Sequence, residues 1–208
     1  QELMQLGNIE PSYLMPPIFP KKSTAVIAGK PGIGKSMLAR QLCIHVAVGL
    51  NEFIGFDLSV THQSAIYIST EDHIEATTYL LHKQLGGMEM PANENLRFIF
   101  ADSLSQPEIL FELKNDLHDK PADLVVIDSF GDIFSGSDSN NNIEMRRTVQ
   151  AFNKIANQFG CLILFVHHIN KGAYNQIPSQ DHIQGGGGLV QKVRLAIILT
   201  EGQGSIRY

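Results

Sequence analysis

The stretch "GKPGIGKS" at residues 29–36 places a lysine and a hydroxyl directly after two spaced glycines. It fits the pattern G-x-x-x-x-G-K-[ST] through Gly29, Gly34, Lys35 and Ser36. In such a loop, backbone N–H groups and the following helix N-terminus form a cradle for a polyphosphate. Lys35 is expected to meet the β- and γ-phosphates, and the Ser36 hydroxyl to bind Mg²⁺. We therefore expect ATP and Mg²⁺ as ligands, with nucleotide contacts from Gly29, Lys30, Pro31, Gly32, Ile33, Gly34, Lys35, Ser36 and Met37.

Carboxylates follow two other apolar runs and can complete a site for phosphate chemistry. "LVVIDS" ends at Asp128, where a carboxylate can hold Mg²⁺ through a water. The alternative for Asp128 is that it caps the next turn. "AIYIST" is followed by Glu71 and Asp72, and Glu71 can accept a proton from an attacking water. Acidic pairs are common in loops, so this interpretation depends on the phosphate loop being present.

Two adjacent histidines, His167 and His168, close the run "LILFVHH". A histidine at this strand end can sense the γ-phosphate or link it to a neighbouring loop. A metal site is less favoured, because adjacent residues on a strand point to opposite sides and no Cys/His cluster joins them.

These residues need a sheet whose strand ends meet at one edge. Strands are predicted over residues 23–29, 64–70, 96–100, 122–129, 161–168 and 193–200. Helices are predicted over residues 35–48, 73–87, 106–120 and 143–160, the second ending at Gly86–Gly87 and the last at Gly160. Nearly all-apolar strands that alternate with helices are typical of a parallel sheet covered on both faces. We predict an α/β fold with a mostly parallel central sheet and helices on both faces.

The composition indicates one domain over residues 1–208, of which the proline-rich residues 1–22 form an extended lead-in. The formal net charge of −5 argues against a protein that coats nucleic acid with its whole surface. Cys43 and Cys161 lie in apolar runs and are expected to be core thiols in a reducing cytosol. No run of eighteen apolar residues and no signal-peptide pattern is present, so we expect a cytoplasmic protein without membrane contact.

Across nearly its whole length the chain resembles the RecA-type P-loop ATPases, and within them the RepA-type hexameric replicative helicases of plasmids and mobile elements. The resemblance rests on "SYLMPP", "GKPGIGKSMLARQL", "IYISTED", "LVVIDS", "LFVHHINKGA" and "GGLVQKVRLAIIL". It implies that Glu71 is the catalytic base, Asp128 the Mg²⁺ carboxylate and His168 the sensor. It also implies the strand order 96–100, 64–69, 123–128, 161–166, 23–28 and 193–199. Where the family often has Arg-Gly-Ser-Ser, this chain has "QGGG" at residues 184–187 and lacks that arginine.

A cation pair, Lys192 and Arg194, precedes the last apolar run. Two residues apart on a strand, both side chains would leave on the same face. The resemblance implies that Arg194 is a finger that reaches the ATP of the next subunit. The alternative is an edge-strand charge that discourages aggregation.

The resemblance implies an ATP-driven helicase or translocase that works on single-stranded DNA as a ring, with a hexamer expected. Residues 129–142 and 170–188 would face the DNA, with contacts from Phe130, Phe134, Lys171 and Tyr174. One alternative is a RecA-type regulatory or recombination ATPase without unwinding activity. A small-molecule P-loop kinase is less favoured, because residues 170–188 contain one lysine and no arginine for a phosphoryl-binding lid.

Overall fold

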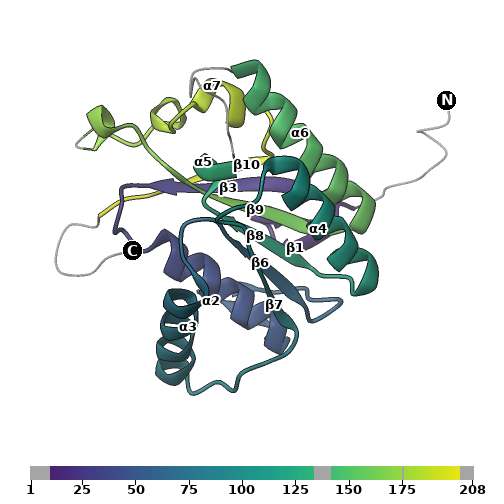
Figure 1. Cartoon of the computed structure of the whole chain (residues 1–208). Coiled ribbons are helices and arrows are strands. Elements are labelled where there is room, and N and C mark those ends of the chain that lie inside the picture. Colours follow the sequence, from purple (N-terminus) through teal and green to yellow (C-terminus); the bar gives the residue numbers. More distant parts are fainter. Residues whose placement is uncertain (1–9, 134–141, 175, 202–208) are drawn as a thin grey trace.

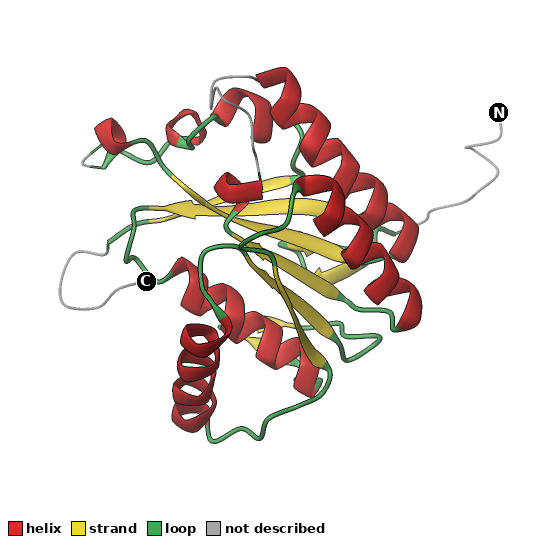
Figure 2. Cartoon of the chain, in the orientation of Figure 1, coloured by secondary structure: helices red, strands yellow, loops and turns green. Residues whose placement is uncertain are grey.

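A six-stranded sheet forms the centre of the molecule, with helices on both faces (Figures 1 and 2). The computed structural model describes residues 10–133, 142–174 and 176–201. The strands of this sheet are β3 (Ser23–Gly29), β6 (Ala65–Ser69), β7 (Leu96–Phe100), β8 (Leu124–Asp128), β9 (Leu162–His168) and β10 (Leu195–Leu199). Their spatial order is β10-β3-β9-β8-β6-β7, and every neighbouring pair is parallel. The predicted strand order and the α/β class are confirmed.

The helices form two layers because the strands are apolar on both faces (Figure 1). The longer ones are α2 (Lys35–Val48) and α3 (Ile74–Met88) on one side, and α4 (Gln106–Asp119) and α6 (Asn142–Phe159) on the other. Shorter ones are α5 (Phe130–Ile133), η1 (Lys171–Ala173), η2 (Gln180–His182) and α7 (Gly186–Leu189). One core joins α4 and α6 to the sheet, and a second joins α2 to the opposite face. The prediction for α2 is confirmed to the residue, and Gly160, with φ 77°, follows α6 directly.

The proline-rich lead-in is more ordered than the sequence predicts. Residues 13–20 form an antiparallel pair, β1 (Tyr13–Met15) and β2 (Phe19–Pro20), with Pro16 and Pro17 in the turn between them. Leu14, Met15 and Phe19 are at most 2% exposed and join the core on the α2 side of the sheet. Burial of these three side chains stabilises the strand pair. The two prolines are tolerated because they lie in the turn, where no ladder hydrogen bond is needed. Residues 1–9 of the predicted lead-in lie outside the described residues.

Two predicted element ends are wrong. Helix α3 continues through Gly86 and Gly87 and ends at Met88, and the residue that caps it, Glu89, takes φ 53°. A glycine inside a helix costs only about 1 kcal/mol, so two glycines near the end did not stop it. Strand β10 begins at Leu195, which leaves Lys192 and Arg194 in the preceding turn. Because neither residue lies on the strand, strand alternation does not put their side chains on one face. A further pair of short strands, β4 (Glu52–Phe53) and β5 (Phe56–Asp57), follows α2.

The carboxyl ends of four central strands meet at one edge of the sheet. The register pairs Gly29 of β3 with His168 of β9, and Ser69 of β6 with Asp128 of β8. In open parallel sheets this edge is where ligands bind.

Candidate nucleotide site

The glycine-rich loop between β3 and α2 wraps around the amino group of Lys35. Lys35 Nζ donates to the backbone oxygens of Gly29 at 3.1 Å and Lys30 at 2.8 Å, and the residue is 5% exposed. Glycine is required at position 29 because a Cβ there would lie 2.9 Å from the Leu199 backbone oxygen. Gly34 takes φ 100°, a conformation that side chains disfavour, directly before the helix begins.

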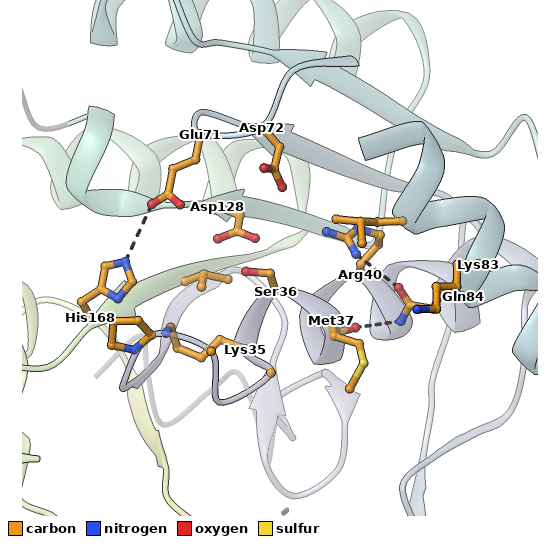
Figure 3. A pocket seen from close by; sticks show the side chains of 15 residues that line it. Lys35, Ser36, Met37, Arg40, Glu71, Asp72, Lys83, Gln84, Asp128 and His168 are labelled. Carbon is orange, nitrogen blue, oxygen red and sulfur yellow. Dashed lines mark hydrogen bonds and ion pairs between the residues drawn. The ribbon is translucent and has the colours of Figure 1, made fainter. Parts of the chain in front are cut away.

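A cavity of about 640 Å³ opens beside this loop (Figure 3). Its walls come from the loop and α2, from the ends of β6, β8 and β9, and from α3. The lining residues are Pro31, Gly32, Gly34, Lys35, Ser36, Met37, Arg40, Glu71, Asp72, Leu80, Lys83, Gln84, Asp128, Val166 and His168. The structure thus brings together the predicted Lys35, Ser36, Glu71, Asp128 and His168.

Three of the nine predicted nucleotide-contacting residues do not line this cavity. Gly29 is buried at the end of β3, Ile33 is 7% exposed, and the Lys30 side chain turns away. Lys30 Nζ lies 5.9 Å from the centre of the Tyr174 ring and 3.7 Å from Glu201 Oε2. These residues shape the loop, and only their backbone groups remain candidates for phosphate contact.

Asp128 is held by a residue that the sequence analysis did not single out. The Tyr67 hydroxyl donates to Asp128 Oδ2, and Tyr67 is 1% exposed in the middle of β6. Burial, followed by the Asp128 charge, raises the pKa of Tyr67 well above its ordinary value, so the hydroxyl keeps the proton it donates.

The turns after β6 and β8 are joined by side-chain hydrogen bonds. Thr70 Oγ1 accepts from the Ser129 backbone N–H at 2.7 Å and donates to Asp132 Oδ2 at 2.8 Å. Ser129 Oγ donates to the same Asp132 oxygen at 2.7 Å. This network fixes Glu71, one residue after Thr70, relative to Asp128, one residue before Ser129.

Glu71 and His168 face each other across the mouth of the cavity (Figure 3). Glu71 Oε1 lies 3.7 Å from His168 Nε2, and the side chains are 54% and 33% exposed. Glu71 is therefore open to water and close to a group that can orient it. An exposed carboxylate beside a phosphate cradle suits a general base for an attacking water.

The charges and donors of the cavity fit a nucleoside triphosphate with Mg²⁺. Burial lowers the pKa of Lys35, and the negative charges of Asp128 and Glu71 partly oppose that shift. The Ser36 hydroxyl and the Asp128 carboxylate, both on the cavity wall, are oxygen donors of the kind Mg²⁺ prefers. Within the described residues, no group of three or more His, Cys, Asp or Glu forms a metal site, so phosphate or water oxygens would complete the coordination of the ion.

The two histidines separate to different surroundings, as strand alternation predicts. His168 lines the nucleotide cavity, whereas His167 is 3% exposed beside a second cavity of about 250 Å³. His167 Nε2 lies 2.9 Å from the Gln184 backbone oxygen, and its Nδ1 has no partner within the described part of the chain. Burial lowers the pKa of His167 to about 4, and the Gln184 hydrogen bond opposes that shift.

The buried His167 predicts a stability loss in acid. The unfolded chain binds a proton at this histidine below about pH 6.5, whereas the folded protein resists protonation down to about pH 4. Between these values the free energy of unfolding should decrease as the pH is lowered, by up to about 1.4 kcal/mol per pH unit. His167→Gln can still donate to the Gln184 backbone oxygen. In this variant the free energy of unfolding, measured with urea, should depend less on pH between these values. His118→Gln on the exposed face of α4 should leave the pH dependence unchanged. An equal pH dependence of the free energy of unfolding in His167→Gln and in the unaltered protein would contradict the assignment of the acid destabilisation to His167.

The predicted contact of Phe130 with DNA is wrong. This residue is fully buried in α5, with its ring centre 4.8 Å from that of Phe165 and 5.5 Å from that of His167. Its large apolar ring stabilises the core instead of facing a ligand. Lys171 is exposed and Tyr174 is half-buried, whereas Phe134 lies outside the described residues.

Both cysteines are free and buried, as the apolar runs predict. Burial raises the pKa of the Cys161 thiol to about 12 and that of Cys43 further still, so both remain protonated core side chains. None of the helices in residues 10–133, 142–174 and 176–201 has both the length and the hydropathy needed to cross a bilayer.

Comparison of the sequence with protein families identifies the family of the chain. Residues 8–174, most of the chain, match the AAA domain family. The chain belongs to the AAA domain family. The search of curated proteins returned no match for the chain. Among solved structures, the crystal structure of a KaiC-like protein from the hyperthermophilic archaeon Pyrococcus horikoshii OT3 is similar over 96% of this chain and 85% of that chain. The identity is 13% and the TM-score 0.64, which supports a RecA-like P-loop NTPase fold.

Proposed function

We propose that the protein is an ATP-hydrolysing motor of the RecA/RepA type. It would form a ring, a hexamer by resemblance, and act as a helicase or translocase on single-stranded DNA during replication of a plasmid or mobile element. The observation that carries the ATPase part is the single cavity onto which Lys35, Ser36, Glu71, Asp128 and His168 all open.

Each of these side chains has a distinct role in the proposal. Lys35 meets the β- and γ-phosphates, and Ser36 with Asp128 would hold Mg²⁺, which neutralises phosphate charge. Glu71 accepts a proton from the attacking water, and His168, 3.7 Å away, senses the γ-phosphate and orients Glu71.

The motor part is supported by the connection between the cavity and residues 170–188. The Gln184 N–H donates to the His168 backbone oxygen at 3.0 Å, and the Asn170 N–H donates to the His182 backbone oxygen at 2.8 Å. A β-bridge between Ile169 and Ile183 closes the same loop. Movement of the strand end that carries His168 would therefore be transmitted to the loop proposed to face DNA.

We propose Arg194 as a finger that reaches the ATP of another subunit. Its backbone N–H donates to the Thr24 oxygen, and the next residue, Leu195, pairs with Ala25 at the amino end of β3. That position lies roughly 13 Å along the strand from Gly29, and Arg194 does not line the cavity. Its side chain is exposed, which is compatible with the proposed contact to a neighbouring copy.

A RecA-type regulatory or recombination ATPase without unwinding activity is the second candidate. The observation that favours it is the burial of Phe130, which removes one of the expected base-stacking aromatics.

Single-stranded DNA should separate these two functions. We expect it to stimulate ATP hydrolysis several-fold, with binding that weakens as salt is raised, because each cation that neutralises a DNA phosphate releases a counter-ion. The measurement is phosphate release with and without DNA, beside the oligomer mass with ATP bound. Lys171→Ala should reduce DNA binding, whereas Lys154→Ala on α6 should not. No DNA binding by an ATP-bound ring would favour the regulatory ATPase.

A further inference from the structure

Arg40 is a buried cation in the wall of the nucleotide cavity. It lies on α2, four residues after Ser36, and is 3% exposed. Its Nη1 donates to Gln84 Oε1 at 3.4 Å, whereas Nε has no partner among the described residues. None of the carboxylates in the described ranges lies within 4 Å of its guanidinium. A buried charge without a counter-ion is costly, so other contacts must hold this one.

The ring of Tyr67 supplies the main contact. The Arg40 guanidinium carbon lies 5.4 Å from the centre of this ring, within the range of a cation–π interaction. On the far side of Arg40, Gln84 Nε2 donates to the Met37 backbone oxygen at 2.8 Å, which ties the group to the start of α2 (Figure 3). Arg40 is therefore clamped between α3 and the phenol.

The same phenol reaches Asp128. Among the described residues, the Tyr67 hydroxyl supplies the only hydrogen bond to the Asp128 carboxylate, at Oδ2. This leaves Oδ1 free of protein partners in the described structure. Arg40 thus contacts the face of a ring whose hydroxyl end fixes one oxygen of the proposed Mg²⁺ carboxylate.

We propose that Tyr67 and Arg40 are positioning residues for Mg²⁺ binding. Tyr67 orients the Asp128 carboxylate by holding Oδ2, and Arg40 acts through Tyr67 by fixing its ring. The inference rests on the proposed function, since it requires Mg²⁺ at Asp128. Hydrogen-bonding partners behind a metal ligand typically contribute about 10- to 100-fold in metal affinity.

Tyr67→Phe removes the hydroxyl and keeps the ring. We expect the Mg²⁺ concentration for half-maximal binding of a fluorescent ATP analogue to rise about 10- to 100-fold. Binding of the analogue in EDTA should be unchanged, because the phosphate loop is intact. Tyr79→Phe, which removes a hydroxyl from an exposed side chain of α3, is the matched control and should bind Mg²⁺ normally.

Arg40→Met removes the cation and keeps a long side chain. We expect a smaller shift in the same Mg²⁺ titration, roughly 2- to 30-fold, and partial recovery in Arg40→Lys, which restores the charge. If Arg40 acts through Tyr67, adding Arg40→Met to Tyr67→Phe should shift the titration no further. Arg147→Met on the exposed face of α6 is the control.

Several outcomes would overturn the inference. One is an equal loss of analogue binding with Mg²⁺ and in EDTA, together with a lowered melting temperature, which indicates a merely structural role. Another is additive shifts in the double variant. An unchanged Mg²⁺ requirement in Tyr67→Phe, beside a raised one in Asp128→Asn, would reject the positioning role alone. An unchanged requirement in Asp128→Asn would reject the proposed Mg²⁺ site as well.

Discussion

Replacing Glu71 with glutamine is expected to lower ATP turnover by at least about 100-fold while leaving ATP affinity nearly unchanged. Glutamine keeps the shape of the side chain but cannot accept a proton from water. The carboxylate is 54% exposed at the cavity mouth and makes no hydrogen bond or ion pair with residues 29–36, so nucleotide binding should survive. Phosphate release measures turnover, and equilibrium titration with a fluorescent ATP analogue measures affinity.

Glu112→Gln is the matched control, because it makes the same change on the exposed face of α4. It should leave both quantities unaltered. Normal turnover in Glu71→Gln would transfer the role to Asp72, the other carboxylate of the pair that lines the cavity, or to another group.

Lys35→Ala is expected to weaken ATP binding by roughly 10- to 100-fold or more, and to lower hydrolysis with it. The variant loses the charge that meets the β- and γ-phosphates. It also loses the two hydrogen bonds that fold the loop onto the amino group, to the backbone oxygens of Gly29 and Lys30. Titration with the same analogue, with thermal unfolding measured alongside, separates lost binding from lost folding.

Lys154→Ala removes an exposed lysine far along α6 and should bind ATP normally. If Lys35→Ala bound and hydrolysed ATP like the unaltered protein, the assignment of residues 29–36 as the phosphate site would be rejected.

The sequence was sufficient to predict the sheet and the residues at its strand ends. Nearly continuous apolar runs fixed the strands, and the phosphate-loop pattern marked β3, so the order of the other strands could be taken from the family resemblance. Parallel strands share a carboxyl edge, which predicts that Glu71, Asp128 and His168 meet beside Lys35, and all four line one cavity. Their individual roles remain predictions.

The residues behind that edge could not be predicted in the same way. Tyr67 lies inside the run "AIYIS", where an apolar pattern predicts ordinary core, and the partner of its hydroxyl is 61 residues away in sequence. Arg40 lies beside the predicted apolar stripe of α2, on a face that α3 and the Tyr67 ring cover only after folding. A charge directly next to Ala39, on the helix that follows the loop, was the one available signal.

The prediction that Phe130 contacts DNA is wrong for a related reason. A residue just after a strand end is expected in a loop, yet here the chain turns immediately into α5 and buries the ring against Phe165. Local composition does not show which side of the turn faces the core. The same limit applies to Leu14 and Phe19, which are buried in a segment whose prolines indicated an irregular lead-in.

The most direct test of the central claim is phosphate release from Mg²⁺-ATP by the unaltered protein, measured beside Lys35→Ala, Glu71→Gln and Asp128→Asn. The proposed site predicts hydrolysis by the unaltered protein and a large loss of turnover in all three variants, with near-normal ATP affinity in Glu71→Gln. Absence of hydrolysis, or equal hydrolysis by all four proteins, would contradict the claim that this cavity is an ATPase site.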